Sequence, residues 1–113
     1  MRFGPEGVRV DESTLRRRVA EAQAGDERAL EDVVRAVRDD VFDLALRMLG
    51  DAADASDAAQ EVLVRVVTKL STFRGESGFR TWVYRGLPRY AAPGDFARAL
   101  RGVLATQGQG TRP

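Results

Sequence analysis

The segment Glu27–Gly50, ERALEDVVRAVRDDVFDLALRMLG, decides the fold of this 113-residue chain. Apolar side chains recur in it at intervals of three and four residues, which is the period of one face of an α-helix. The positions concerned are Leu30, Val33, Val34, Val37, Val41, Leu44, Ala45 and Met48. Asp26 is suited to cap the start of this helix and Gly50 to end it. The pattern predicts one long helix, or two nearly collinear helices, over residues 27–49.

Two shorter helical patterns flank the long one. Residues 14–24 carry apolar side chains on one side and are followed by Gly25, which predicts a first helix that ends there. After the long helix, either Asp51 or Asp54 can cap a third helix that runs to about Leu70. These helices are amphipathic, so each needs a neighbour to cover its apolar side.

A fourth helical segment begins at Phe79 and is closed early by Pro88, which cannot donate a backbone hydrogen bond and disfavours helical geometry at the residue before it. The sequence therefore predicts an all-α fold, a small bundle of about four helices. The expected organisation is a flexible N-terminus over 1–11, the helical domain over 12–87, and a tail over 88–113 that is irregular or weakly helical, with at most a short helix over 95–105 and otherwise disordered.

Composition excludes several classes of function. The chain contains no cysteine and no histidine, which removes disulfides, thiolate chemistry, the commonest zinc sites and the usual general base. We therefore expect no enzymatic activity, no metal and no cofactor. No apolar run approaches the ~18 residues of a membrane helix, and no export signal is recognisable. We expect a cytoplasmic protein.

The net charge of +1 conceals two blocks of opposite sign. Residues 26–61 hold four basic and eleven acidic residues, whereas residues 62–90 hold six basic residues and one acidic residue. Aromatic residues are interleaved with the basic block: Phe73, Phe79, Trp82, Tyr84 and Tyr90. Arginine holds phosphates and aromatic rings stack on unpaired bases, so this block indicates contact with single-stranded nucleic acid. The alternative is that these charges only solvate helix faces.

The third helix has an apolar half and a polar half. The apolar half, expected to be buried, consists of Ala55, Ala58, Ala59, Val62, Leu63, Val66, Val67 and Leu70. The polar half consists of Asp54, Asp57, Gln60, Glu61, Arg65 and Thr68, with Val64 in its middle. An apolar centre with a polar rim is typical of a partner-binding patch. A single exposed valine is also ordinary on a protein surface.

Four blocks of sequence, in this order and spacing, resemble region two of bacterial sigma factors of the extracytoplasmic-function type. They are Gln23–Leu30 (QAGDERAL), Leu44–Asp51 (LALRMLGD), Asp54–Val62 (DASDAAQEV) and Phe73–Arg85 (FRGESGFRTWVYR). The resemblance covers about residues 12–85. It implies a sigma factor domain that binds core RNA polymerase and the minus-ten promoter element, and so supports promoter melting and transcription initiation.

The resemblance also implies roles for individual residues. Binding to the clamp helices of the largest polymerase subunit is implied for Asp54, Asp57, Gln60, Glu61, Val64 and Arg65. Binding to promoter DNA, mainly the single-stranded non-template strand, is implied for Phe73, Arg74, Ser77, Phe79, Arg80, Thr81, Trp82, Tyr84 and Arg85. The loop over 72–78 would hold a flipped base, with Gly75 and Gly78 permitting close approach. Trp82 has a second interpretation as a core residue.

The chain departs from the family pattern after Arg85. The family's fourth helix continues past this position, whereas Gly86, Leu87 and Pro88 interrupt it here. Nothing in the tail resembles the helix-turn-helix domain by which the family recognises a minus-thirty-five element. The alternative function is therefore a truncated, sigma-like regulatory module that occupies core polymerase or an anti-sigma factor without initiating transcription. A generic helical scaffold is the third interpretation.

Overall fold

The computed structural model describes residues 10–111. Its α-helices are α1 (Glu12–Gln23), α2 (Glu27–Leu49), α3 (Ala52–Lys69), α4 (Phe79–Tyr84) and α5 (Pro93–Thr111), with short 3-10 turns η1 (Leu70–Thr72) and η2 (Pro88–Tyr90). No strand occurs within these described residues. The all-α fold class is therefore confirmed. Most of the segment predicted to be a flexible N-terminus, residues 1–9, lies outside the described residues.

Residues 27–49 form one continuous helix, and its ends are fixed as the sequence predicts. The Asp26 carboxylate accepts hydrogen bonds from the backbone N–H groups of Arg28 and Ala29. Gly50 follows the helix in the left-handed conformation, with φ of 72°, which glycine adopts without steric cost. Of the two candidate caps for α3, Asp51 is the one used, because its Oδ1 accepts from the N–H of Asp54 at 2.9 Å.

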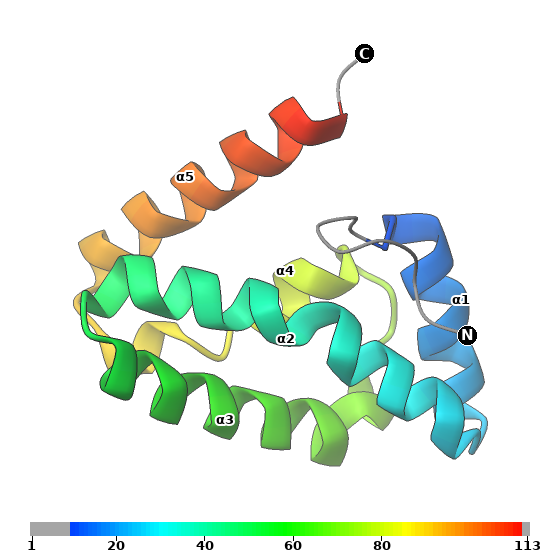
Figure 1. Cartoon of the computed structure of the whole chain (residues 1–113). Helices are drawn as coiled ribbons and strands as arrows, with labels where there is room; N and C mark the ends of the chain where they lie inside the picture. Colours follow the sequence, from blue (N-terminus) through cyan, green and yellow to red (C-terminus); the bar gives the residue numbers. More distant parts are fainter. Residues whose placement is uncertain (1–9, 112–113) are drawn as a thin grey trace.

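Helix α2 lies at the centre of the bundle (Figure 1). Helices α2 and α3 run side by side, α1 packs against α2, and the short α4 contacts α1, α2 and α3. The core residues of α2 and α3 are Ala29, Val33, Val37, Val41, Leu44, Ala45, Met48, Ala55, Ala58, Ala59, Val62 and Val66. Leu30, also predicted to be in the core, is half-buried and packs against it. The helical period thus predicted the core of this pair almost completely.

Two residues on the apolar half of α3 differ from the prediction. Val67 was expected to be buried, yet 46% of its surface is exposed, and Leu63 is only half-buried. Val67 lies about 60° around the helix from Val64, at the edge of the buried face. Within residues 10–111 this edge of α3 is left partly uncovered, so the exposed apolar area includes Val67 as well as the Val64 predicted from the sequence.

The tail is more ordered than predicted. Helix α5 covers Pro93–Thr111, whereas the sequence predicted at most a short helix over 95–105 and disorder elsewhere. Proline is favoured in the first turn of a helix, and Ala99 and Val103 of α5 are buried in the core. Helix propagation from this anchor adds one hydrogen bond for each residue fixed. The bundle therefore has a fifth helix, which leaves it at an angle to α2 (Figure 1).

Candidate functional site

The six residues predicted to bind polymerase all lie exposed along one side of α3. We call this surface the α3 face; it consists of Asp54, Asp57, Gln60, Glu61, Val64 and Arg65. Val64, in the middle of this face, is 61% exposed, whereas the valines of the core are almost fully buried. The α3 face therefore combines an uncovered apolar centre with a charged and polar surround.

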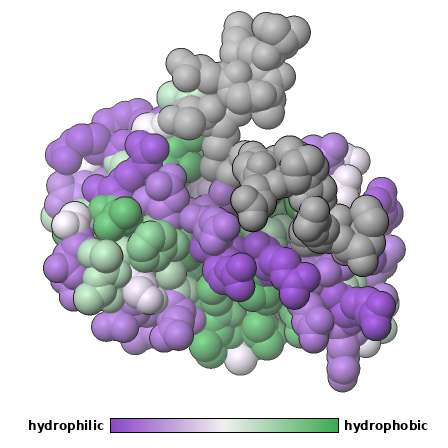
Figure 2. Space-filling view, viewed as in Figure 1, coloured by the Kyte–Doolittle hydropathy of each residue, from purple (hydrophilic) through white to green (hydrophobic). Residues whose placement is uncertain are grey.

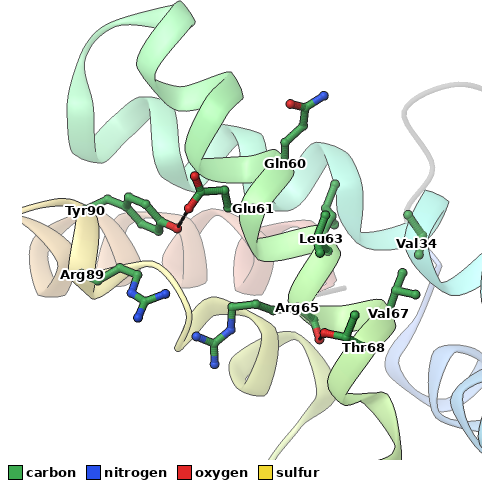
Figure 3. Close-up of a pocket in the computed structure, with 10 residues that line it drawn as sticks. Val34, Gln60, Glu61, Leu63, Arg65, Val67, Thr68, Arg89 and Tyr90 are labelled. Atoms are coloured by element: carbon green, nitrogen blue, oxygen red, sulfur yellow. Dashed lines mark hydrogen bonds between the residues drawn. The ribbon is translucent and has the colours of Figure 1, made fainter.

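An open apolar groove of about 620 Å³ runs along the α3 face. Val34 of α2, Leu63, Val64 and Val67 of α3, and Arg89 and Tyr90 of η2 line it. Figure 2 shows a hydrophobic area reaching the surface over α3, bordered by hydrophilic residues. In Figure 3 Glu61 and Tyr90 point toward each other across the groove, and the Tyr90 hydroxyl donates to Glu61 Oε1 at 2.5 Å. Sequence reasoning did not include Val34, Val67, Arg89 or Tyr90 in this surface.

Helix α1 holds the loop that joins η1 to α4. The side-chain amide of Gln23 donates through Nε2 to the carbonyl oxygens of both Leu70 and Phe73, each at 2.9 Å. At the other end of α1, Glu12 Oε2 accepts from the N–H of Phe79 at 2.9 Å, and so caps α4 from a distant part of the chain. The residue before the helix, Gly78, has no side chain that could cap it. The Glu12 carboxylate takes that role and satisfies the backbone N–H of Phe79.

Three aromatic rings, one at the start of this loop and two on α4, pack against one another. Phe73 and Phe79 are buried and lie 5.2 Å apart, measured between ring centroids. Trp82 packs on both, at 5.4 Å and 5.6 Å, and is only half-buried. Trp82 therefore packs against the core, as one of its two interpretations predicts, and is still partly accessible to solvent.

Four of the nine residues predicted to bind DNA are core residues in the structure, which is a correction to that prediction. Phe73, Phe79, Arg80 and Tyr84 are all less than a tenth exposed. Arg80 Nε donates to Asp40 Oδ2 at 2.7 Å, and a second guanidinium nitrogen donates to the Val10 carbonyl at 2.9 Å. A buried ring cannot stack on a base, and a paired buried guanidinium cannot meet a phosphate. We therefore leave these four out of the candidate surface.

The other predicted DNA contacts are accessible. Arg74 and Arg85 are exposed, and Ser77 and Thr81 are half-buried. Gly75 has φ of 78°, a conformation that residues with a Cβ rarely adopt. Its carbonyl accepts from the Arg16 guanidinium at 3.4 Å, so α1 also contacts the tip of the loop.

A second groove, of about 270 Å³, lies between the C-terminal half of α3 and α4. We call it the basic groove; Arg65, Lys69, Thr72, Trp82 and Arg85 are among its lining residues. It brings three cations and one aromatic edge together, which is the combination that holds a nucleic-acid backbone and a base. The basic block and the loop predicted from the sequence contained Lys69 and Thr72 respectively, but neither residue was among the nine individual DNA contacts. Lys69 follows Arg65 by four residues, a spacing that places both on one side of a helix.

The described residues include no group of acidic, histidine or cysteine side chains that could hold a metal ion. No helix in residues 10–111 is long and apolar enough to cross a membrane.

Comparison with known proteins identifies the family of this domain. The family model described as sigma-70 region 2 matches residues 33–89, which run from α2 through both grooves to η2. The chain belongs to the sigma-70 region 2 family. Among the relatives of this region 2 domain is the ECF RNA polymerase sigma factor SigW of Bacillus subtilis strain 168. The two are 34% identical over 74 residues, which cover 66% of this chain and 40% of that protein.

Two further sigma factors match the same region 2 domain. The RNA polymerase sigma-H factor of Pseudomonas aeruginosa PAO1 is 39% identical over 67 residues, and the ECF RNA polymerase sigma-E factor of Escherichia coli K12 is 34% identical over 67 residues. Each alignment covers 59% of this chain and 35% of the relative. The region 2 domain thus matches well under half the length of these sigma factors, and its resemblance to the extracytoplasmic-function type is confirmed.

Proposed function

We propose that this region 2 domain acts in the cytoplasm as a transcription-initiation factor, binding core RNA polymerase through the α3 face and opened minus-ten promoter DNA through the basic groove. The observation that carries the proposal is the continuous exposure of the six α3-face residues around an uncovered Val64. The domain would supply binding energy and no covalent chemistry.

The α3 face suits a helical partner of opposite charge. Its N-terminal half is acidic through Asp54, Asp57 and Glu61, so it complements a basic surface such as the clamp helices of the largest polymerase subunit. The apolar groove beside it supplies the desolvated centre that interfaces need, and the charged residues supply the rim. An acidic rim also speeds association with a basic partner.

The basic groove suits single-stranded DNA. Its three cations can each neutralise a phosphate. On logarithmic axes affinity falls as the salt concentration rises, and each phosphate contact steepens that slope by roughly 0.7. Unstacking a base costs a few kcal/mol, and stacking on an aromatic ring returns about 1–3 kcal/mol. Trp82 is the ring placed to do this. DNA binding by the isolated domain should therefore be weak, salt-dependent and selective for single strands.

The test of the polymerase interface uses two substitutions on the α3 face, Glu61→Lys and Val64→Asp. Both should weaken binding to core polymerase by at least tenfold without changing the circular-dichroism melt, because both side chains are exposed. The matched controls are Asp39→Lys, on a carboxylate that is 93% exposed, and Leu104→Asp, on a side chain of α5 that is 46% exposed. Equal affinity of the test and control variants would remove the α3 face from the proposal.

A further inference from the structure

The η2 turn lies against α3, since Arg89 and Tyr90 line the apolar groove together with residues of that helix. Leu87, just before the turn, is fully buried, and its carbonyl accepts from the N–H of Tyr90 at 3.0 Å. The turn is therefore anchored in the core and closed by its own backbone. This fixes the side chains of Arg89 and Tyr90 beside the apolar groove, as Figure 3 shows.

Tyr90 joins this turn to the α3 face through one hydrogen bond. Its hydroxyl donates to Glu61 Oε1 at 2.5 Å, although the two residues are 29 positions apart in the chain. The Tyr90 ring is half-buried and packs against the hydrophobic core. A free glutamate side chain samples many rotamers, whereas this carboxylate is held by a ring that has little freedom of its own.

We propose that the η2 turn is the second wall of the polymerase-docking surface, and that Tyr90 is a positioning residue that holds Glu61 in the conformation the partner binds. The inference rests on the proposed function of the α3 face. Holding Glu61 before binding removes the entropy cost of ordering it at the interface. Arg89, on the same turn, adds a positive charge at the edge of the groove, opposite in sign to Glu61.

The ionisation of Tyr90 is consistent with this role. Partial burial raises the pKa of Tyr90 above its ordinary value of 10.0. The hydrogen bond to Glu61 and the negative charge of that carboxylate raise the pKa further, while Arg89 opposes them. Because the pKa of Tyr90 is raised, Tyr90 is a neutral hydrogen-bond donor at neutral pH.

The first experiment measures the affinity of wild type, Tyr90→Phe, Glu61→Gln and the double variant for core polymerase. Tyr90→Phe keeps the ring and removes only the hydroxyl, so the thermal melt should not change while affinity falls about 3- to 10-fold. The two losses should be non-additive, because both variants act on the same contact: Tyr90→Phe removes the donor, and Glu61→Gln keeps an acceptor oxygen but removes the charge that strengthens the hydrogen bond. Wild-type or tighter binding by Tyr90→Phe, with wild type bound normally, would overturn the inference and leave the proposed function standing.

The second experiment follows phenolate absorbance in the free domain, with Tyr90→Phe subtracted to remove the signal of the other tyrosine, Tyr84. Glu61→Gln should lower the pKa of Tyr90 toward its ordinary value. An unchanged titration would show that the contact is absent in solution and would overturn the inference without reference to polymerase. Failure of wild type to bind polymerase would instead reject the proposed function, and the inference with it.

Discussion

The ion pair between Arg80 and Asp40 should make Asp40→Ala strongly destabilising. Both side chains are only 10% exposed, and the Nε–Oδ2 distance is 2.7 Å. The pair joins α4 to the middle of α2, and the same guanidinium contacts Val10 and Glu12 near the start of α1. The substitution would leave a buried guanidinium without its nearest counter-charge.

The size of the effect follows from what remains around Arg80. Removing one partner of a buried ion pair costs about 3–5 kcal/mol. Two contacts are retained, the Val10 carbonyl at 2.9 Å and Glu12 at 3.4 Å, although Glu12 is 46% exposed and partly screened. We therefore expect a loss of about 2–4 kcal/mol out of a total of ~5–15 kcal/mol. With a urea dependence of about 1–1.5 kcal/mol per molar, the unfolding midpoint should fall by roughly 1.3–4 M.

The neighbouring residue provides the control. Asp39 is 93% exposed, and its nearest cation is Arg38 at 3.9 Å, so Asp39→Ala should change stability by no more than about 0.5 kcal/mol. Urea unfolding followed by far-ultraviolet circular dichroism distinguishes the two variants. Equal midpoints for Asp40→Ala and Asp39→Ala would show that the pair is not structural. A loss of DNA binding in Arg80→Ala at unchanged stability would return Arg80 to the DNA surface.

Further substitutions test the core, the loop and the basic groove. Val66→Asp should unfold the domain in a circular-dichroism melt, because Val66 is 2% exposed and an unpaired buried charge costs several kcal/mol. Gln23→Ala should lower the free energy of unfolding by about 1–3 kcal/mol and speed hydrogen exchange in the loop whose carbonyls Gln23 binds; unchanged exchange would show that α1 does not hold the loop. Gly75→Ala should cost about 1 kcal/mol in thermal unfolding, because φ is 78° there. Arg85→Ala should weaken binding of a single-stranded oligonucleotide and reduce the salt dependence of that binding, at unchanged stability. Unaltered affinity at low salt would show that the basic groove is not the DNA-binding surface.

The sequence predicts most of the α2–α3 pair because periodicity and capping are local signals. Asp26, Gly50 and the apolar period between them lie within one stretch, and the structure uses all of them. The exposure of Val64 could also be predicted, since it lies on the polar half of the helix among Asp57, Gln60, Glu61 and Arg65. Val67 could not be assigned in this way, because its exposure depends on how far the other helices extend over α3.

Long-range partners explain the errors in the candidate site. An arginine in a basic block resembles a phosphate contact until its partner is known, and Asp40 lies 40 residues from Arg80. The same reasoning applies to Glu61 and Tyr90, whose side chains meet although the two residues are 29 positions apart in the chain. The tail helix was underestimated because its order depends on Ala99 and Val103 packing into a distant core.

Formation of a ternary complex tests the central claim most directly. Core polymerase is titrated into a labelled single-stranded oligonucleotide pool with a randomised minus-ten segment, with and without this domain. Our account predicts that the domain increases oligonucleotide capture, that Val64→Asp abolishes the increase, and that the captured pool is enriched in particular sequences. Binding to polymerase with no gain in capture would favour a module that only occupies the enzyme. Capture that is identical with and without the domain, when the domain also fails to bind polymerase, would contradict the account.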